Sequence, residues 1–366
     1  MAITTTILRF VRRPAFLSIG LILVCSGSNP QGVSAQSLGG QANPPIIRST
    51  DSQFSTIVLG PIPPSPAPLA AQVGRSGAGL TILPTFNSTG ATAIDAATQT
   101  VINNAIAFYQ NTFTNNITVN IEFHNMSSGL GQSIAFIFPV PYSTYCSALA
   151  ASATSPDDMT AVADTPCGST NPVNSTGNID VKSPSGRVLG INTSEQNFGG
   201  SCPTGNFTGS GCIGLNVSLA NMHPGLLFAT VEHEIDEVLG LGSALNGTTT
   251  PTDPWPEDLF RWHGASTRSY AANTSTTNPC GGGTPAAFFS IDGGTTNLDD
   301  FNNCNNSGDY GDWITHSPPQ VQDAFINISG TPPSLTTSSS EVRALDVIGY
   351  SIASSAKHRR GQVTSE

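Results

Sequence analysis

The sequence predicts an α+β domain, because segments with helical and with strand periodicity alternate along it. Apolar residues recur at helical spacing over residues 95–113, and over residues 117–124 they alternate with polar residues as in a half-buried strand. A second strand, at residues 213–219, leads into a helical pattern that ends at Gly240. A helix leading into a strand begins an α+β arrangement. Residues 132–140 and 148–163 are expected to add a strand and a short helix.

The ends of the chain differ in composition from its middle. Residues 1–35 predict a signal peptide, with Arg9, Arg12 and Arg13 before an apolar run and Val-Ser-Ala at its end. That run is too short to span a bilayer. Residues 36–79 are rich in Pro, Ser and Gly and predict a flexible linker. The folded domain is expected over residues 80–350, with a polar tail at 351–366. We expect a secreted, extracellular or periplasmic protein.

The net charge bears on the classes of partner. The formal charge is −11, and removal of the signal peptide, with three arginines and no acids, changes it to −14. Such a chain repels nucleic acid and anionic membranes. We therefore expect no nucleic-acid partner and no membrane association after signal cleavage. The sequence leaves the oligomeric state open.

Cysteine usage fits export. Of the seven cysteines, Cys25 lies in the signal peptide, which leaves an even number in the mature chain. Even numbers in exported chains indicate disulfides. Fifteen pairings of six cysteines are possible. Proximity along the chain favours Cys146–Cys167, Cys202–Cys212 and Cys280–Cys304.

The most charged stretch is residues 230–240, in a chain that is only 10% charged. At helical spacing, His233 and Glu237 lie one turn apart and Glu234 lies beside them. Asn221 is expected to cap this helix, Pro224 to lie in its first turn and Gly240 to end it. The opposite face is apolar, with Leu227, Phe228, Val231, Ile235, Val238 and Leu239.

This stretch has the spacing of a metal-binding helix. In the zinc-protease pattern H-E-x-x-H, two histidines bind Zn²⁺ and the intervening Glu is the general base acting on metal-bound water. Here Glu237 replaces the second histidine, and a carboxylate oxygen is also a zinc ligand. We therefore predict His233 and Glu237 as ligands and Glu234 as catalytic base. The alternative interpretation is a solvated acidic helix face.

Two further predictions concern metal sites downstream. Asp258 or His263 is expected to provide a third zinc ligand, although a helix-start Asp and a surface His are the ordinary roles of such residues. Arg261, between them, has the chemistry to bind a carboxylate. Calcium is a second candidate cofactor, because acidic residues surround a predicted hairpin at residues 288–298, although EF-hand spacing is missing. These are Asp299, Asp300, Asp309 and Asp312.

Several separated motifs resemble a family of exported bacterial proteins catalogued as metalloproteases. They are HEIDEVLG at 233–240, DLFR at 258–261, FSIDGG at 289–294, GDYGDW at 308–313 and ALDVIGY at 344–350. The stretch at 233–240 is also distantly similar to the metzincins, H-E-x-x-H-x-x-G-x-x-H. His233, Glu234 and Gly240 match, whereas Glu237 and Ser243 stand at the two other ligand positions.

The resemblance implies a zincin-like mixed sheet with an active-site helix beneath it and a loop-rich, disulfide-stapled C-terminal part. It implies a secreted, zinc-dependent peptidase or peptidase-like hydrolase that acts on protein or peptide substrates. The alternative is a non-catalytic extracellular binding or matrix protein on a degenerate metalloprotease scaffold.

Overall fold

The computed structural model describes residues 46–50, 79–221, 223, 225–245, 253–271, 287–303, 308–326 and 331–353. The predicted signal peptide, the end of the polar tail and the pair Cys280 and Cys304 lie outside these ranges.

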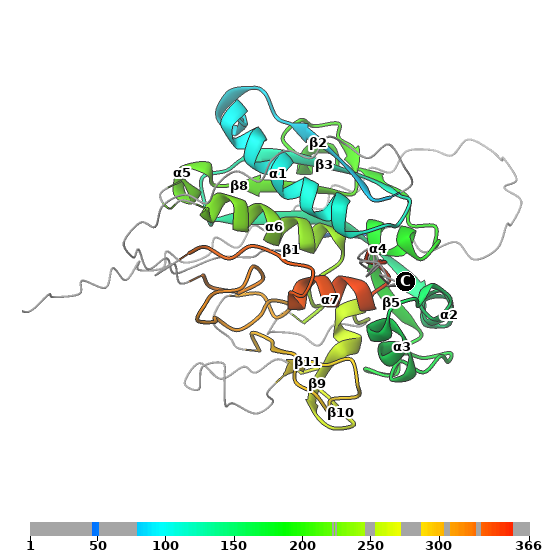
Figure 1. Cartoon of the computed structure of the whole chain (residues 1–366). Coiled ribbons are helices and arrows are strands. Elements are labelled where there is room, and N and C mark those ends of the chain that lie inside the picture. Colours follow the sequence, from blue (N-terminus) through cyan, green and yellow to red (C-terminus); the bar gives the residue numbers. More distant parts are fainter. Residues whose placement is uncertain are drawn as a thin grey trace, which may run out of the picture. The chain divides into compact units, whose positions relative to one another are not determined.

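A mixed six-stranded sheet forms one layer of the fold (Figure 1). Its strand order is β1-β4-β8-β3-β2, with β5 also paired to β4. The three strands β2, β3 and β8 are parallel, whereas β4 runs antiparallel to β8, β1 and β5. The bounds are β1 Ile46–Thr50, β2 Thr81–Phe86, β3 Thr118–Asn125, β4 Gly131–Pro141, β5 Asn178–Lys182 and β8 Gly211–Leu215. The predicted α+β class with a mixed sheet is confirmed.

The predicted linker contributes a strand. Residues 46–50 form β1, which pairs antiparallel with β4 in a register that joins Ile46 to Ile137 and Thr50 to Ser133. The sequence Ile-Ile-Arg-Ser-Thr contains three β-branched residues, which favour an extended backbone. The Pro, Ser and Gly content around this short segment concealed it. Residues 51–78 lie outside the described part of the chain.

Two helices pack against each other and against the sheet (Figure 1). Helix α1, Ala96–Thr112, begins where the Asp95 side chain accepts a hydrogen bond from the Thr98 amide at 2.7 Å. Its buried face, with Ile102, Ala105, Ile106 and Tyr109, contacts α6, Leu226–Leu239. The Tyr109 hydroxyl donates to the Glu232 carbonyl at 2.7 Å. The helices predicted at residues 95–113 and before Gly240 therefore meet in one core.

The remaining elements are short. The bounds are η1 Gly90–Thr92, α2 Tyr142–Ser152, α3 Pro156–Ala163, α4 Ser183–Val188, β6 Gln196–Asn197, η2 Gly199–Ser201, β7 Thr208–Gly209, α5 Val217–Ala220, η3 Pro256–Phe260, β9 Arg261–Gly264, β10 Thr267–Arg268, β11 Phe288–Phe289, β12 Asp299–Asp300 and α7 Ser340–Val347. The helix predicted at 148–163 is thus two helices, because Ser155 and Asp158 form a capping box that starts α3 at Pro156. The strand predicted at 213–219 ends at Leu215, because Asn216 caps α5.

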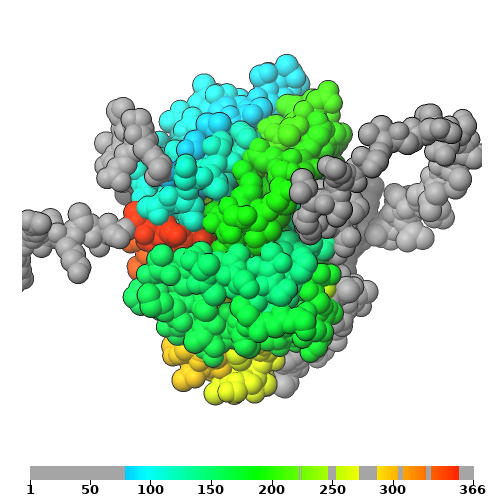
Figure 2. Space-filling model, turned by 90° about the vertical axis from the view of Figure 1, so that its right-hand side faces the viewer, coloured from blue at the N-terminus to red at the C-terminus, as the bar shows by residue number. Residues whose placement is uncertain are grey.

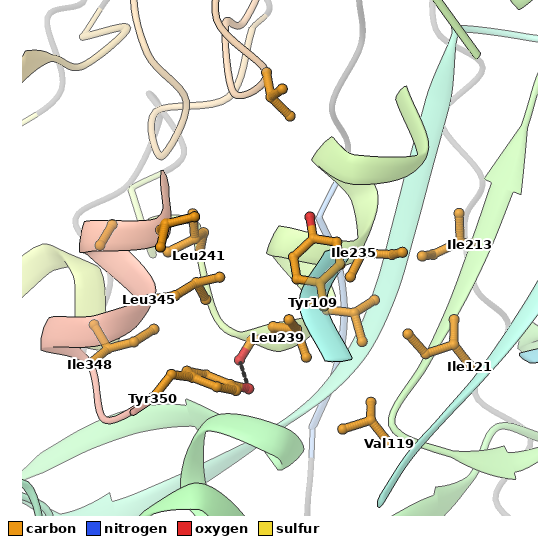
Figure 3. Packing of buried hydrophobic residues seen from close by; sticks show 14 of the residues in the cluster. Tyr109, Val119, Ile121, Ile213, Ile235, Leu239, Leu241, Leu345, Ile348 and Tyr350 are labelled. Atoms are coloured by element: carbon orange, nitrogen blue, oxygen red, sulfur yellow. Dashed lines mark hydrogen bonds between the residues drawn. The ribbon is translucent and has the colours of Figure 1, made fainter. Parts of the chain in front are cut away.

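The C-terminal part joins the same hydrophobic core. Helix α7 contributes Leu345, and Ile348 and Tyr350 follow it; these side chains lie beside Leu239 and Leu241 (Figure 3). The Tyr350 hydroxyl donates to the Leu239 carbonyl at 2.8 Å. The last turn of α6 is therefore held from the C-terminal side.

Two disulfides form where proximity predicted them, Cys146–Cys167 and Cys202–Cys212, with Cα separations of 5.4 and 6.0 Å. The first joins α2 to the chain after α3, a region that forms the middle of the face shown in Figure 2. The second joins η2 to β8. Both precede the C-terminal part, and the pair predicted within that part, Cys280–Cys304, lies outside the described residues. Among the described helices, none has the length and apolarity that crossing a membrane requires.

Candidate metal centre

Helix α6 carries the candidate site and has well-defined ends. It begins after Gly225, whose φ of +85° favours glycine, and it ends at Gly240, as predicted, with a φ of +150°. The prediction that Asn221 caps α6 is wrong, because Asn221 ends the preceding helix α5. A Cβ at Gly240 would also lie 2.9 Å from Ile348 Cδ1 and 3.1 Å from Ser185 Cβ, so a larger residue would crowd both side chains.

All the ionisable residues of α6 are buried. Glu232, His233, Glu234, Asp236 and Glu237 are each at most 1% exposed. The alternative interpretation of a solvated acidic face is therefore wrong. Buried charges must be paired, hydrogen-bonded, neutralised or bound to metal.

Three side chains converge on one point. A ring nitrogen of His233 and one carboxylate oxygen each of Glu237 and Asp312 lie within 4.8 Å of one another. His233 Nε2 is 3.8 Å from Glu237 Oε1 and 3.8 Å from Asp312 Oδ1. These separations exceed those of hydrogen bonds but suit atoms that share one cation. The described structure thus contains a buried group able to hold a metal ion.

Asp312 reaches this point through pairing of two loops. Trp313 and Asp323 form a parallel bridge, in which the Trp313 amide donates to the Gln322 carbonyl at 2.8 Å and the Ala324 amide to the Trp313 carbonyl at 2.9 Å. The residues that precede the bridge, Asp312 and Gln322, lie close enough for Gln322 Nε2 to donate to Asp312 Oδ1 at 3.1 Å. Both therefore face His233 together.

The orientation of His233 leaves one nitrogen as a ligand. Its Nδ1 lies 2.9 Å from the Val321 carbonyl, which only accepts, so Nδ1 carries the proton and the Nε2 lone pair faces the two carboxylates. Burial lowers the pKa of His233 to about 4, so the ring is neutral at pH 7. A neutral imidazole with an oriented second nitrogen is the form that binds metals.

The two carboxylates carry spare acceptor atoms. The Ser133 hydroxyl donates to Glu237 Oε2 at 2.6 Å, whereas Glu237 Oε1 and Asp312 Oδ2 accept no hydrogen bond from the described residues. Burial raises the pKa of Glu237 to about 7 and the pKa of Asp312 well above its usual value. A nitrogen lone pair and two such carboxylates repel one another unless protons or a cation lie between them. The donor set therefore fits a divalent cation.

Glu234 lies next to this group and is fully buried. It forms a side-chain hydrogen bond with Glu237. Its carboxylate lies over Gly131 at the start of β4, where a Cβ would come within about 3 Å of both the Glu234 carboxyl carbon, at 2.8 Å, and Thr230 Cγ2, at 2.8 Å. Glycine at position 131 is thus what leaves room for Glu234.

Lys182 is a buried cation that the sequence analysis did not assign to the site. Its Nζ donates to the Glu237 and Leu241 carbonyls at 2.7 Å each. A cation at this end of α6 complements the helix dipole. Burial lowers the pKa of Lys182, and the Glu237 carboxylate opposes that effect.

The structure does not bring Asp258 or His263 to His233 and Glu237, and Asp312 occupies the third position. Asp258 is buried and accepts hydrogen bonds from the Ser243 hydroxyl at 2.5 Å and from the Ala244 and Trp255 amides at 3.0 and 2.9 Å. It holds the loop that follows α6. His263 is exposed on β9. The charged residues at 257–263 could be recognised in the sequence, but the directions in which their side chains point could not.

Arg261 contacts neighbouring loops of the C-terminal part. It is buried, donates to the Tyr310 carbonyl and to Asn303 Oδ1, and lies over the Phe301 ring. Its hydrogen-bond partners among the described residues are thus a backbone carbonyl and a side-chain amide.

The four acidic residues predicted for calcium have separate partners. Asp299 contacts His316 at 3.0 Å, Asp300 accepts from Asn297, and Asp309 accepts from the Gly311 amide, while Asp312 lies at the α6 site. A second cluster of potential ligands, Glu122, Cys202 and Cys212, contains the sulfurs of a disulfide. Bonded sulfurs are not thiolate ligands.

Comparison with known proteins gives no match to a family model, to a curated protein or to a solved structure. The chemistry of this site is therefore argued from its own residues.

Proposed function

We propose that this protein is a secreted metal-dependent hydrolase of the peptidase type, with a cation held by His233, Glu237 and Asp312. The observation that carries the proposal is the convergence of these three ligand atoms within 4.8 Å, with Glu234 beside them. The mixed sheet above α6 agrees with the zincin-like arrangement that the motif resemblance implies.

The donor set supports zinc as the cation. One imidazole nitrogen and two carboxylate oxygens are zinc ligands, and three protein ligands are the usual number in catalytic zinc sites. A bound cation supplies Lewis acidity toward a substrate carbonyl. Two carboxylates make the site harder than a histidine-rich one, so manganese is the competing metal.

Glu234 is the proposed general base. It lies one residue from His233 and forms a hydrogen bond with Glu237, so it is adjacent to the ligand atoms without being one of the three. In the proposed reaction Glu234 accepts the proton of the attacking water and later transfers it to the leaving amine. Gly131 leaves the space that this carboxylate occupies.

Secretion is part of the proposal. It is supported by the basic and apolar residues at the start of the sequence and by the two disulfides, which persist in oxidising compartments. A peptide substrate is inferred from the HEIDEVLG motif.

The test compares zinc-loaded wild type with Glu234→Gln on a casein substrate. Glu234→Gln should lower the cleavage rate by about 10²- to 10⁴-fold, the usual contribution of a general base, and should retain zinc. Glu232→Gln is the matched control, because Glu232 is also buried on α6 but accepts from the Leu335 amide instead of joining the three ligands. Full activity in Glu234→Gln, or cleavage that resists chelation, would refute the hydrolase proposal.

A non-catalytic extracellular protein is the second candidate. Burial favours it, because His233, Glu237 and Asp312 are each at most 1% exposed, so the cation would have a structural role. In that case wild type binds zinc and melts at a lower temperature after chelation, yet cleaves no substrate under any loading condition.

A further inference from the structure

Gln322 is the residue that closes the site from the side of the C-terminal loops. It is fully buried. Its backbone N–H donates to Glu341 Oε1 at 3.0 Å, and its backbone carbonyl accepts from the Trp313 backbone N–H at 2.8 Å. These two bonds fix its backbone, so its side chain has a defined origin beside Asp312.

The two ends of the Gln322 amide have unequal surroundings. Nε2 lies 3.1 Å from Asp312 Oδ1 and 3.4 Å from His233 Nε2. Oε1 is buried and accepts no hydrogen bond from the described residues. A buried carbonyl oxygen without a partner is costly, so this side chain is satisfied at one end only.

Rotation about the Cγ–Cδ bond exchanges the two ends. An amide has two donor hydrogens on nitrogen and two lone pairs on oxygen, in nearly equal volumes. Turned by 180°, the amide would direct Oε1 toward His233 Nε2 and Asp312 Oδ1. Acceptors in that arrangement repel one another unless they share a cation, and amide oxygens are ligands for hard cations.

We propose that Gln322 is the fourth ligand of the metal site, through Oε1, so that protein atoms alone complete a four-coordinate centre. The inference rests on the proposed cation site at His233, Glu237 and Asp312. It adds a regulatory property to the proposed function, since a substrate carbonyl reaches the cation only by displacing the Gln322 amide. A closed four-ligand set is the form seen in structural zinc sites, whereas catalytic sites keep one position open.

The experiment measures metal affinity and water access in full-length mature protein. Gln322→Met keeps the side-chain length and removes the oxygen, so the dissociation constant for Zn²⁺ should rise by about 10- to 100-fold. In the Mn²⁺-loaded form, a water molecule should replace the lost ligand, so water-proton relaxation should be faster than in wild type. Gln320→Met, two residues away and partly exposed, is the matched control and should change neither quantity.

Gln322→Glu serves as the rescue variant and covers failure of Gln322→Met to fold. It retains an oxygen ligand and adds a charge, so Zn²⁺ should bind at least as tightly as in wild type, with slow relaxation in the Mn²⁺ form. Unchanged affinity and relaxation in Gln322→Met, or binding at least tenfold weaker in Gln322→Glu, would overturn the inference.

Asp312→Ala separates the two proposals. If Asp312→Ala loses zinc while Gln322→Met does not, the three-ligand site stands and the fourth ligand is refuted. If folded wild type binds neither Zn²⁺ nor Mn²⁺, both proposals fail.

Discussion

His233 and His316 each lie between two carboxylates, but the two imidazoles have opposite electrostatic states. His316 is within hydrogen-bonding distance of Asp323 at 2.6 Å and of Asp299 at 3.0 Å, so both ring nitrogens donate. These bonds raise the pKa of His316 to about 10. His233 is 3.8 Å from each of its two carboxylates and its other nitrogen bonds a carbonyl. Burial lowers its pKa to about 4.

The difference shows what distinguishes an ion pair from a candidate metal site built of the same residue types. At His316 each ring N–H donates to one carboxylate, Nδ1 to Asp323 and Nε2 to Asp299. At His233 the Nε2 atom and one oxygen of each carboxylate face a common point, with 3.8 Å between the nitrogen and each oxygen. Two features separate the cases: the distance between the ring nitrogens and the carboxylate oxygens, and whether the other ring nitrogen bonds a carboxylate or a backbone carbonyl.

The largest expected effect comes from neutralising one carboxylate beside His233 and, for comparison, one beside His316. Asp312→Asn should weaken Zn²⁺ binding by about 100-fold or more, because a charged ligand is lost, whereas Asp323→Asn should leave it within about threefold. Isothermal titration of both variants measures this. Equal losses in the two variants would break the proposed distinction between the sites.

A second prediction concerns stability. His316→Gln should lower the free energy of unfolding by about 2–3 kcal/mol, because Asp299 and Asp323 lose their common cation while a quarter of the His316 side chain is solvent-screened. Urea denaturation checks the value, and zinc stoichiometry serves as the control that should not change. A loss below about 0.5 kcal/mol would show that the ion pairs are not stabilising.

The pH dependence sharpens the same contrast. The folded-state pKa of His316, about 10, exceeds the usual value of 6.5, so its contribution is fully present below pH 6.5 and is lost as pH rises toward 10. Wild type should therefore lose stability over this interval more steeply than His316→Gln. Thermal melts of both proteins between pH 6 and 10 measure the difference, and parallel curves would contradict the assignment.

The smallest expected effect tests whether the Ser133 hydroxyl orients the proposed ligand Glu237. Ser133→Ala removes the 2.6 Å hydrogen bond to Glu237 Oε2 and should weaken Zn²⁺ binding by about tenfold. The pH dependence of stability from His316 should not change. An affinity equal to that of wild type would show that Ser133 does not orient this carboxylate.

Local sequence patterns predicted the helix and two of the three candidate metal ligands. Apolar spacing identified α6, Gly240 marked its end, and the i, i+4 spacing placed His233 and Glu237 one turn apart. The burial of the acidic side chains of α6 was not predicted. The sequence does not show that α1 and the loop at Leu335 pack against the helix at Glu232. Amphipathic spacing describes one helix face at a time.

The position of the third candidate ligand, Asp312, depends on long-range pairing. Asp312 was noted as one of four acidic residues in a loop, but its direction is set by the bridge between Trp313 and Asp323, which no local pattern encodes. Asp258, and not Asp312, was predicted as a third zinc ligand, yet its carboxylate lies at the start of η3 and accepts a hydrogen bond from the Trp255 amide. No sequence pattern identified Gln322 as a residue of the candidate site, because glutamines are common in polar loops.

Crystals grown with Zn²⁺ test the central claim directly, through an anomalous difference map recorded at the zinc edge. The account predicts one strong peak about 2.0–2.2 Å from His233 Nε2 and from a carboxylate oxygen of both Glu237 and Asp312. A map without a peak between these three residues, in crystals that hold zinc elsewhere on the protein, would contradict it.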